Sequence, residues 1–171
     1  MKINEEIKNL NLPKSLLVVM GSHHGIIHFL DADQVIQVDE HRVDTPVYSD
    51  NEGMSQRGGT EGSVVGSVLE PKKKEAQEEF SRDFAAKVKA LVQKESIESI
   101  YLYSPLEVKG LVETDWSHEN QALIQDRFDG NFVSESSNDL LAMIEEKRKE
   151  EEKEEATGEA KDILEKTAHI Q

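Results

Sequence analysis

The stretch that decides the fold is Ser15-Leu-Leu-Val-Val-Met20-Gly-Ser-His-His-Gly25-Ile-Ile-His-Phe-Leu30. Residues 15–20 form an apolar run that ends at a glycine, which is typical of a fully buried strand. Residues 25–30 are again apolar and rich in β-branched side chains, and a turn-like tetrad separates the two runs. The pair therefore predicts a β-hairpin. Residues 35–38 follow the turn-rich triplet Asp31-Ala32-Asp33 and predict a third antiparallel strand.

From Pro71 onward the apolar period becomes helical. One stripe predicts a long helix with Pro71 in its first turn, and it consists of Ala76, Phe80, Phe84, Val88 and Leu91. A strand is expected at residues 97–103. Ser104-Pro105-Leu106-Glu107 then has the form of a capping box and predicts a short helix that runs towards Leu111 or Val112.

The last third of the chain predicts three further elements. They are a helix that contains Leu123, Ile124 and Phe128, a short strand near residues 131–133, and a long helix capped by Ser136-Ser137-Asn138-Asp139. The last helix should pack Leu140, Leu141 and Ile144 inward. This order of elements predicts an α/β fold, a mixed β-sheet flanked by helices in a ribonuclease H-like arrangement. We expect a polar N-terminal segment at 1–14, a single domain at 15–145 and a charged helical extension at 146–171.

Composition narrows the class of protein. The 171 residues include 20 Lys and Arg against 35 Asp and Glu, a formal charge of −15, which disfavours broad adhesion to naked nucleic acid. The absence of cysteine excludes disulfides and thiol nucleophiles. No stretch approaches the ~20 apolar residues of a membrane span. The N-terminus is polar and has no apolar signal region, so we expect a cytoplasmic protein without a membrane partner.

Neither a metal nor a catalytic residue is predicted. His23, His24 and His28 lie close to Asp31 and Asp33, but alternation in a hairpin separates His23 from the other two histidines. A zinc site needs three or four converging ligands, so we expect no metal and no cofactor. The first strand contains no Asp or Glu, which argues against a two-metal nuclease.

Residues 44–67 differ from the rest of the chain, because they hold five glycines and almost no apolar period. A polar loop of this length inside a compact domain is uncommon and is usually functional or disordered. Its Gly58-Gly59-Thr60-Glu61 lacks the Gly-Lys-Ser/Thr of a phosphate-binding loop, and Glu61 would repel phosphate. From the residues alone, a flexible connector stays open as an interpretation.

Taken together, these features resemble a known family. The hairpin, the long loop with Arg57-Gly58-Gly59-Thr60, the helix with Phe80 and Phe84, and the strand that leads into Ser104-Pro105-Leu106-Glu107 look like the middle domain of archaeal and eukaryotic class-one peptide-chain release factors and of Pelota. The sequence is more similar still to their bacterial relatives, the release-factor-like proteins often labelled host attachment proteins. The resemblance covers roughly residues 15–145.

The resemblance implies a translation-associated protein that binds the ribosome, rRNA or tRNA. In the family the loop carries Gly-Gly-Gln, which promotes hydrolysis of peptidyl-tRNA in the peptidyl transferase centre. Here Thr60 stands where that glutamine would be, so we expect binding without hydrolysis. The implied functional loop is Gln56, Arg57, Gly58, Gly59 and Thr60, and the implied RNA contacts are Lys72, Lys73 and Lys74. The alternative, which the acidic charge favours, is an interaction module that uses the same fold to bind an unknown protein partner away from the ribosome.

Overall fold

The computed structural model describes residues 12–31, 34–44 and 69–168. Most of the predicted N-terminal segment and of the predicted loop therefore lies outside the described residues. The elements are β1 (Ser15–Met20), β2 (His24–Asp31), β3 (Gln34–Arg42), α1 (Leu69–Glu95), β4 (Ser99–Ser104), the 3-10 helix η2 (Leu106–Val108), α2 (Lys109–Asp115), α3 (His118–Ala122), β5 (Ile124–Asp129) and α4 (Ser137–Ala168).

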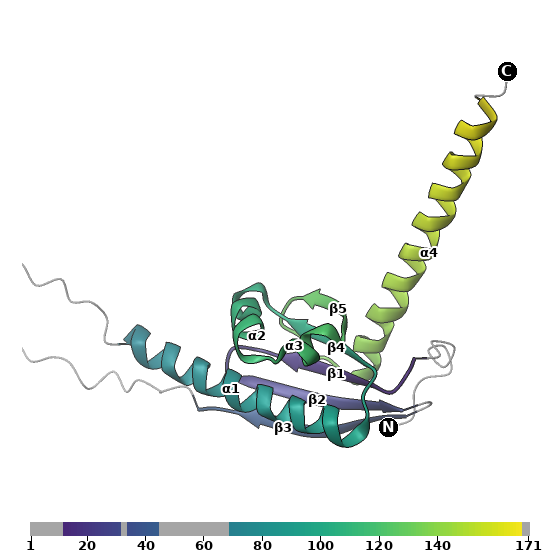
Figure 1. The fold of residues 1–171 in the computed structure, drawn as a ribbon. Helices are drawn as coiled ribbons and strands as arrows, with labels where there is room; N and C mark the ends of the chain where they lie inside the picture. Colours follow the sequence, from purple (N-terminus) through teal and green to yellow (C-terminus); the bar gives the residue numbers. More distant parts are fainter. Residues whose placement is uncertain (1–11, 32–33, 45–68, 169–171) are drawn as a thin grey trace, which may run out of the picture.

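The strands form one five-stranded sheet in the order β3-β2-β1-β4-β5 (Figure 1). Strands β1, β2 and β3 pair antiparallel, whereas β4 joins β1 and β5 joins β4 in parallel. Parallel neighbours need crossover connections: α1 returns the chain from the outer strand β3 to β4 beside β1, and η2, α2 and α3 connect β4 to β5. The predicted α/β fold, with a mixed sheet in a ribonuclease H-like order, is confirmed.

Both faces of the sheet are covered, which explains the continuous apolar run in β1. Leu16, Val18 and Met20 pack beneath α1 and α2, and the alternating residues Leu17 and Val19 pack beneath α4. All six residues of β1 are buried. A central strand that is buried on both faces has no solvent-exposed face that needs polar residues, so its sequence is one apolar run.

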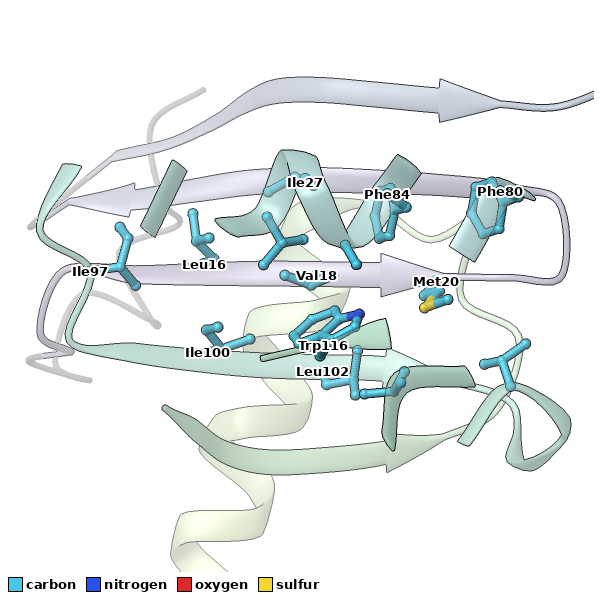
Figure 2. Packing of buried hydrophobic residues seen from close by; sticks show 14 residues of the cluster. Leu16, Val18, Met20, Ile27, Phe80, Phe84, Ile97, Ile100, Leu102 and Trp116 are labelled. Carbon is cyan, nitrogen blue, oxygen red and sulfur yellow. The ribbon is translucent and has the colours of Figure 1, made fainter. Parts of the chain in front are cut away.

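The predicted apolar stripe lies on the buried face of α1 (Figure 2). Phe80, Phe84 and Val88 are fully buried in the cluster between α1 and the sheet. The rings of Phe80 and Phe84 are stacked, with centroids 5.4 Å apart. Phe84 lies directly over Gly25 of β2, because a Cβ atom at that position would come within 2.5 Å of the ring.

The predicted cap of the last helix is confirmed. The Ser136 hydroxyl accepts a hydrogen bond from the Asp139 N–H at 3.3 Å, and the Asp139 carboxylate accepts one from the Ser136 N–H at 3.3 Å. This reciprocal pair satisfies two backbone donors at the start of α4. Leu140 packs into the sheet beneath the cap, and the buried Tyr103 hydroxyl donates to its carbonyl at 2.6 Å. Beyond its buried first turns α4 runs away from the sheet (Figure 1).

The predicted capping box at Ser104 is wrong. Ser104 is the last residue of β4, and the cap position of η2 is Pro105, which makes no side-chain capping bond. Pairing within the sheet takes precedence over the local motif: Ser104 pairs with Asp129 of β5, and its carbonyl accepts a hydrogen bond from the Gly130 N–H at 3.1 Å.

The predicted helix around Leu123, Ile124 and Phe128 is also wrong. Helix α3 ends at Ala122, and Ile124–Asp129 is the strand β5. Ile124 packs against the cluster beneath α1, whereas a register shift places Asp126 and Phe128 on the face covered by α4. There Lys147 of α4 binds the largely buried Asp126. The short strand expected near 131–133 is a turn-like connection, in which Phe132 and Val133 pack against the core cluster beneath α4.

Among the described residues, no helix combines the length and the apolar character that crossing a membrane requires.

Candidate functional site

The loop residues predicted to be functional connect β3 to α1. Gln56, Arg57, Gly58, Gly59 and Thr60 all lie outside the described residues. The two ends of the connection are described, since β3 ends at Arg42 and α1 begins at Leu69. The residues that flank the segment lie at the end of the sheet where β1 and β3 terminate.

The β3 end of residues 45–68 is bonded to the turn between β1 and β2. The Val43 N–H, just past β3, donates to the His23 carbonyl at 2.9 Å. Burial is the larger cause that lowers the pKa of His23, and the charge of Lys73 lowers this pKa further. The segment thus leaves the fold beside His23.

Aromatic stacking fixes the middle of α1 over the end of β3. His41 of β3 stacks on Phe80 with ring centroids 5.7 Å apart and planes within 8°. Phe80 in turn stacks on Phe84, so three rings connect the strand to the helix. His23 Nδ1 and His41 Nε2 are buried and have no hydrogen-bond partner among the described residues. The base of the segment is held by packing and by backbone bonds rather than by a side-chain polar network.

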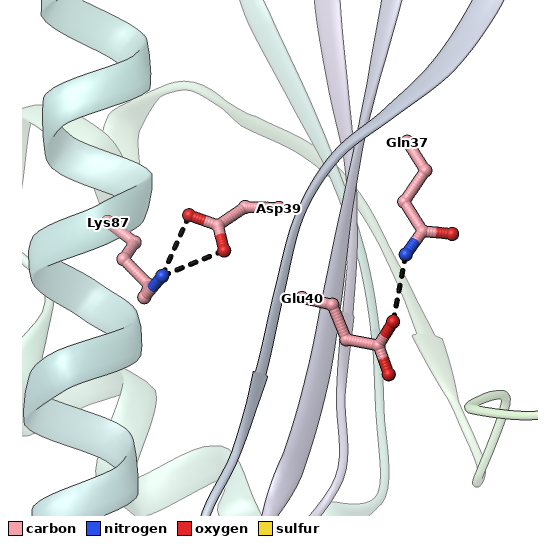
Figure 3. Close-up of polar contacts among 4 residues, drawn as sticks. All are labelled: Gln37, Asp39, Glu40 and Lys87. Atoms are coloured by element: carbon pink, nitrogen blue, oxygen red, sulfur yellow. Dashed lines mark hydrogen bonds and ion pairs between the residues drawn. The ribbon is translucent and has the colours of Figure 1, made fainter.

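Charged contacts hold β3 from both faces (Figure 3). Lys87 of α1 donates to both carboxylate oxygens of Asp39, at 2.7 and 2.9 Å. On the other face, Glu40 accepts from Gln37 at 3.0 Å and pairs with His24 at 2.8 Å. The hydrogen bonds from His24 and Gln37 lower the pKa of Glu40, and the bond from His24 has the larger effect. These contacts hold the second half of β3 in place beneath α1.

The predicted lysines stand on the first turns of α1. Lys73 and Lys74 are exposed, and Lys74 Nζ lies 3.7 Å from Glu78 Oε1 in an exposed ion pair. Such surface pairs contribute about 0 to 1 kcal/mol and exchange readily with another anion. Lys72 belongs to the helical backbone, and its side chain lies outside what the structure describes.

The three clustered histidines do not converge on a metal. His24 pairs with Glu40, whereas His28 is 8% exposed within β2, and burial lowers its pKa. Among the described side chains, no group of three or more potential ligands could hold a metal ion. An arrangement that anchors a long segment at both ends and adds exposed cations at its base suits binding.

A second feature escaped the sequence analysis. A hollow of about 420 Å³ lies between the β2–β3 half of the sheet and the start of α4, and its lining comprises Ile26, His28, Val35, Ile36, Gln37, Glu135, Ser136 and Ser137. Its two halves lie about a hundred residues apart in the chain. No local spacing in the sequence could have predicted it.

Comparison with known proteins gives a likeness in fold. No family model matches the sequence, and no curated protein matches it. Among solved structures, the chain is similar to an archaeal translation termination factor, aRF1, with a TM-score of 0.44 and 11% identity over 84% of this chain and 41% of that one. It is also similar to a structure described as an archaeal protein, with a TM-score of 0.42 and 9% identity over 90% of this chain and 42% of that one. The chain thus spans about two fifths of the length of each.

Proposed function

We propose that this protein is a release-factor-like, translation-associated protein that binds the ribosome through residues 45–68 without hydrolysing peptidyl-tRNA. One observation carries the proposal: the Gly58-Gly59 segment joins β3 to α1, the β3 flank is bonded to the His23 carbonyl, and α1 is packed on β3 through the stacked rings of His41 and Phe80. A long segment held at both ends on a rigid base can be presented to a partner without displacing the sheet. Cytoplasmic location is part of the same proposal.

The residues of the segment favour close approach over catalysis. Gly58 and Gly59 have no Cβ atom, which lets a partner's backbone or base come close to the chain. Thr60 offers a hydroxyl but no amide, so the group that the resembled family uses at this place is missing. Orienting a water is a positioning effect and depends on the geometry of one side chain. We therefore infer binding to a site in rRNA or tRNA with hydrolysis lost.

Any RNA contact has to be local, because the whole chain carries a charge of −15. Arg57 lies within the segment, and Lys72, Lys73 and Lys74 follow it directly on α1. Phosphate contacts by Lys and Arg release counterions, so binding through these residues must weaken as salt rises. Salt dependence is thus the signature that separates this binding mode from an apolar contact.

A second candidate function is a protein–protein interaction module that uses the same fold away from the ribosome. The charge of −15 favours this alternative, because rRNA repels an acidic protein wherever cations are not in direct contact. In that case the protein would show no association with ribosomes at any salt concentration.

Ribosome pelleting at two salt concentrations tests the proposal. The test variant carries Lys73→Ala and Lys74→Ala, and the matched control carries Lys89→Ala and Lys94→Ala, which remove the same charge from exposed sites near the other end of α1. If both test lysines contact phosphates, their loss lowers the slope of log affinity against log salt by about 1.5. The control should pellet like the wild type. Equal loss in both variants would show that only net charge matters and would contradict the proposed contact.

A further inference from the structure

The strand β3 has an unusual outer edge. Among the described strands it is the outermost on its side of the sheet. Ile36 is 46% exposed and Val38 41% exposed, and they are two of the three large hydrophobic side chains exposed in the described chain. Residues 34–38 contain no charged side chain, whereas the whole chain is 32% charged. Edge strands usually carry charges that discourage pairing, so this uncharged stretch is an exception that indicates a partner.

The hollow described above adjoins this edge. Its apolar walls are Ile26 and Val35, Ile36 borders it on the strand, and Glu135 contributes a carboxylate beside the hydroxyls of Ser136 and Ser137. A long side chain with an aliphatic stem and a polar end fits such a lining, because the stem can pack on the walls while the end meets the polar groups. Glu135 is the one acidic residue in the lining, so the preferred polar end is a cation.

The surroundings of the hollow carry the same charge preference. The strands β2 and β3 together with residues 130–139 contain five acidic side chains, Asp31, Asp39, Glu40, Glu135 and Asp139, and one basic side chain, Arg42. Lys87 neutralises Asp39 from the α1 face. The other acids leave a negative field that attracts basic ligands. His28 also lines the hollow, and burial lowers its pKa, so at neutral pH it does not repel a cation.

We propose that the outer edge of β3 and this hollow bind an extended basic peptide, which lies along the strand over Ile36 and Val38 and inserts one lysine or arginine side chain into the hollow. The stem of that side chain packs on Ile26, and its cation meets the Glu135 carboxylate. Extended peptides commonly dock at sheet edges, where pockets for alternate side chains give specificity. The regular pairing of β3 with β2 shifts at Val38, between the partners Ile27 and His28, so the bulge marks one end of the docking stretch.

This inference goes beyond the proposed function, since it assigns a partner class to the end of β3 opposite residues 45–68. The probe is a fluorescein-labelled synthetic peptide of about eight alternating lysine and valine residues, the length of an ordinary strand. Binding is measured by fluorescence anisotropy, and the site is located by amide chemical shifts in nuclear magnetic resonance spectra. The largest shifts are expected at residues 36–38 and 135–137, with the β5 edge unchanged.

Two variants and a matched control make the test specific. Glu135→Lys removes the carboxylate, and Ile36→Lys places a charge on the exposed edge. Each should weaken binding about tenfold or more, as loss of a directly paired charge at an interface does. The control Gln125→Lys adds one lysine to an exposed site on β5, the opposite edge of the sheet, and should change affinity less than about twofold. Both target sites are exposed, so the fold is retained, which melting curves verify.

Four results would overturn the proposal. One is equal weakening by all three lysine variants, which would mean unspecific attraction to an acidic protein. Another is equal binding of a peptide of alternating glutamate and valine. The third is a set of shifts that avoids residues 36–38. The fourth is a dimer, seen by sedimentation and lost in Ile36→Lys, which would assign the edge to a second copy of this chain.

Discussion

Replacing Gly25 by alanine tests how α1 is seated on the sheet. A Cβ atom at Gly25 would lie 2.5 Å from Cε2, 2.6 Å from Cζ and 3.0 Å from Cδ2 of Phe84. Phe84 is fully buried and stacked on Phe80, so its ring has little room to move (Figure 2). The helix has to lift or the ring has to leave its preferred rotamer. Either change disturbs the packing of α1 on the sheet, including the stacking of Phe80 on His41.

The expected cost follows from two opposing effects. Overpacking a filled core by one methyl group costs about 1 to 3 kcal/mol. Alanine is better than glycine inside a strand by about 0.5 to 1 kcal/mol, which offsets part of that cost. A net loss of about 1 to 2 kcal/mol should lower the melting temperature by roughly 2 to 8 °C in a chain of this size.

Thermal and urea unfolding followed by circular dichroism measure the effect. Gly110→Ala is the matched control, because a Cβ atom there meets nothing within 4 Å and the residue lies in α2. That substitution should leave stability unchanged or raise it by up to about 1 kcal/mol. Gly25→Ala combined with Phe84→Leu should cost less than the sum of the two single changes, since they share one contact. Stability of Gly25→Ala equal to the wild type, or strict additivity in the double variant, would refute the reasoning.

Three further predictions concern other contacts. Lys87→Ala should lower the free energy of unfolding by about 1 kcal/mol, because it removes the hydrogen-bonded ion pair with Asp39. The loss should be smaller at high salt, and a loss that does not depend on salt would contradict the charge contribution. Removing residues 158–171 should shift the melting temperature by less than about 2 °C, as expected of a surface change, because none of the described side chains of α4 after Ile144 is buried. A fall of more than about 10 °C would show that the tail packs on the core. The pKa of His28 is lowered in the folded state, so its contribution to stability is present above pH 6.5 and lost as pH falls below that value. His28→Gln should therefore flatten the fall in melting temperature between about pH 7.5 and 5.5. An unchanged slope of melting temperature against pH would contradict this.

The sequence predicted those elements whose local pattern agrees with their tertiary role. The apolar run of β1 and the stripe with Phe80 and Phe84 are buried as their periods require. The cap at Ser136 works because the first turn of α4 is free to form it. Such consistency between local preference and global fold is what makes an element readable from sequence.

The errors arose where distant partners override the local pattern. Ser104 matches a capping box, but its backbone belongs to the pairing of β4 with β5. The strand pattern of β5 was obscured by the register shift after Ile124 and by Asp126, a charged residue whose partner Lys147 lies 21 positions later. The hollow beside β3 has the same character, since Ile26 and Glu135 meet only through the fold. For the predicted site, the sequence supplied the loop and the lysines, and the structure supplied the bond that ties the end of β3 to the His23 carbonyl.

The most direct test of the proposed function measures peptide release and ribosome pelleting in the same samples. Purified protein is added to ribosomal complexes that carry peptidyl-tRNA, beside a variant with Gly58→Ala and Gly59→Ala. The wild type should pellet with the complexes at low salt and release no peptide above background, whereas the variant should pellet less at an unchanged melting temperature. Release of peptide by the wild type would contradict the loss of hydrolysis at Thr60, and absence of the wild type from the pellet at low salt would contradict ribosome binding itself.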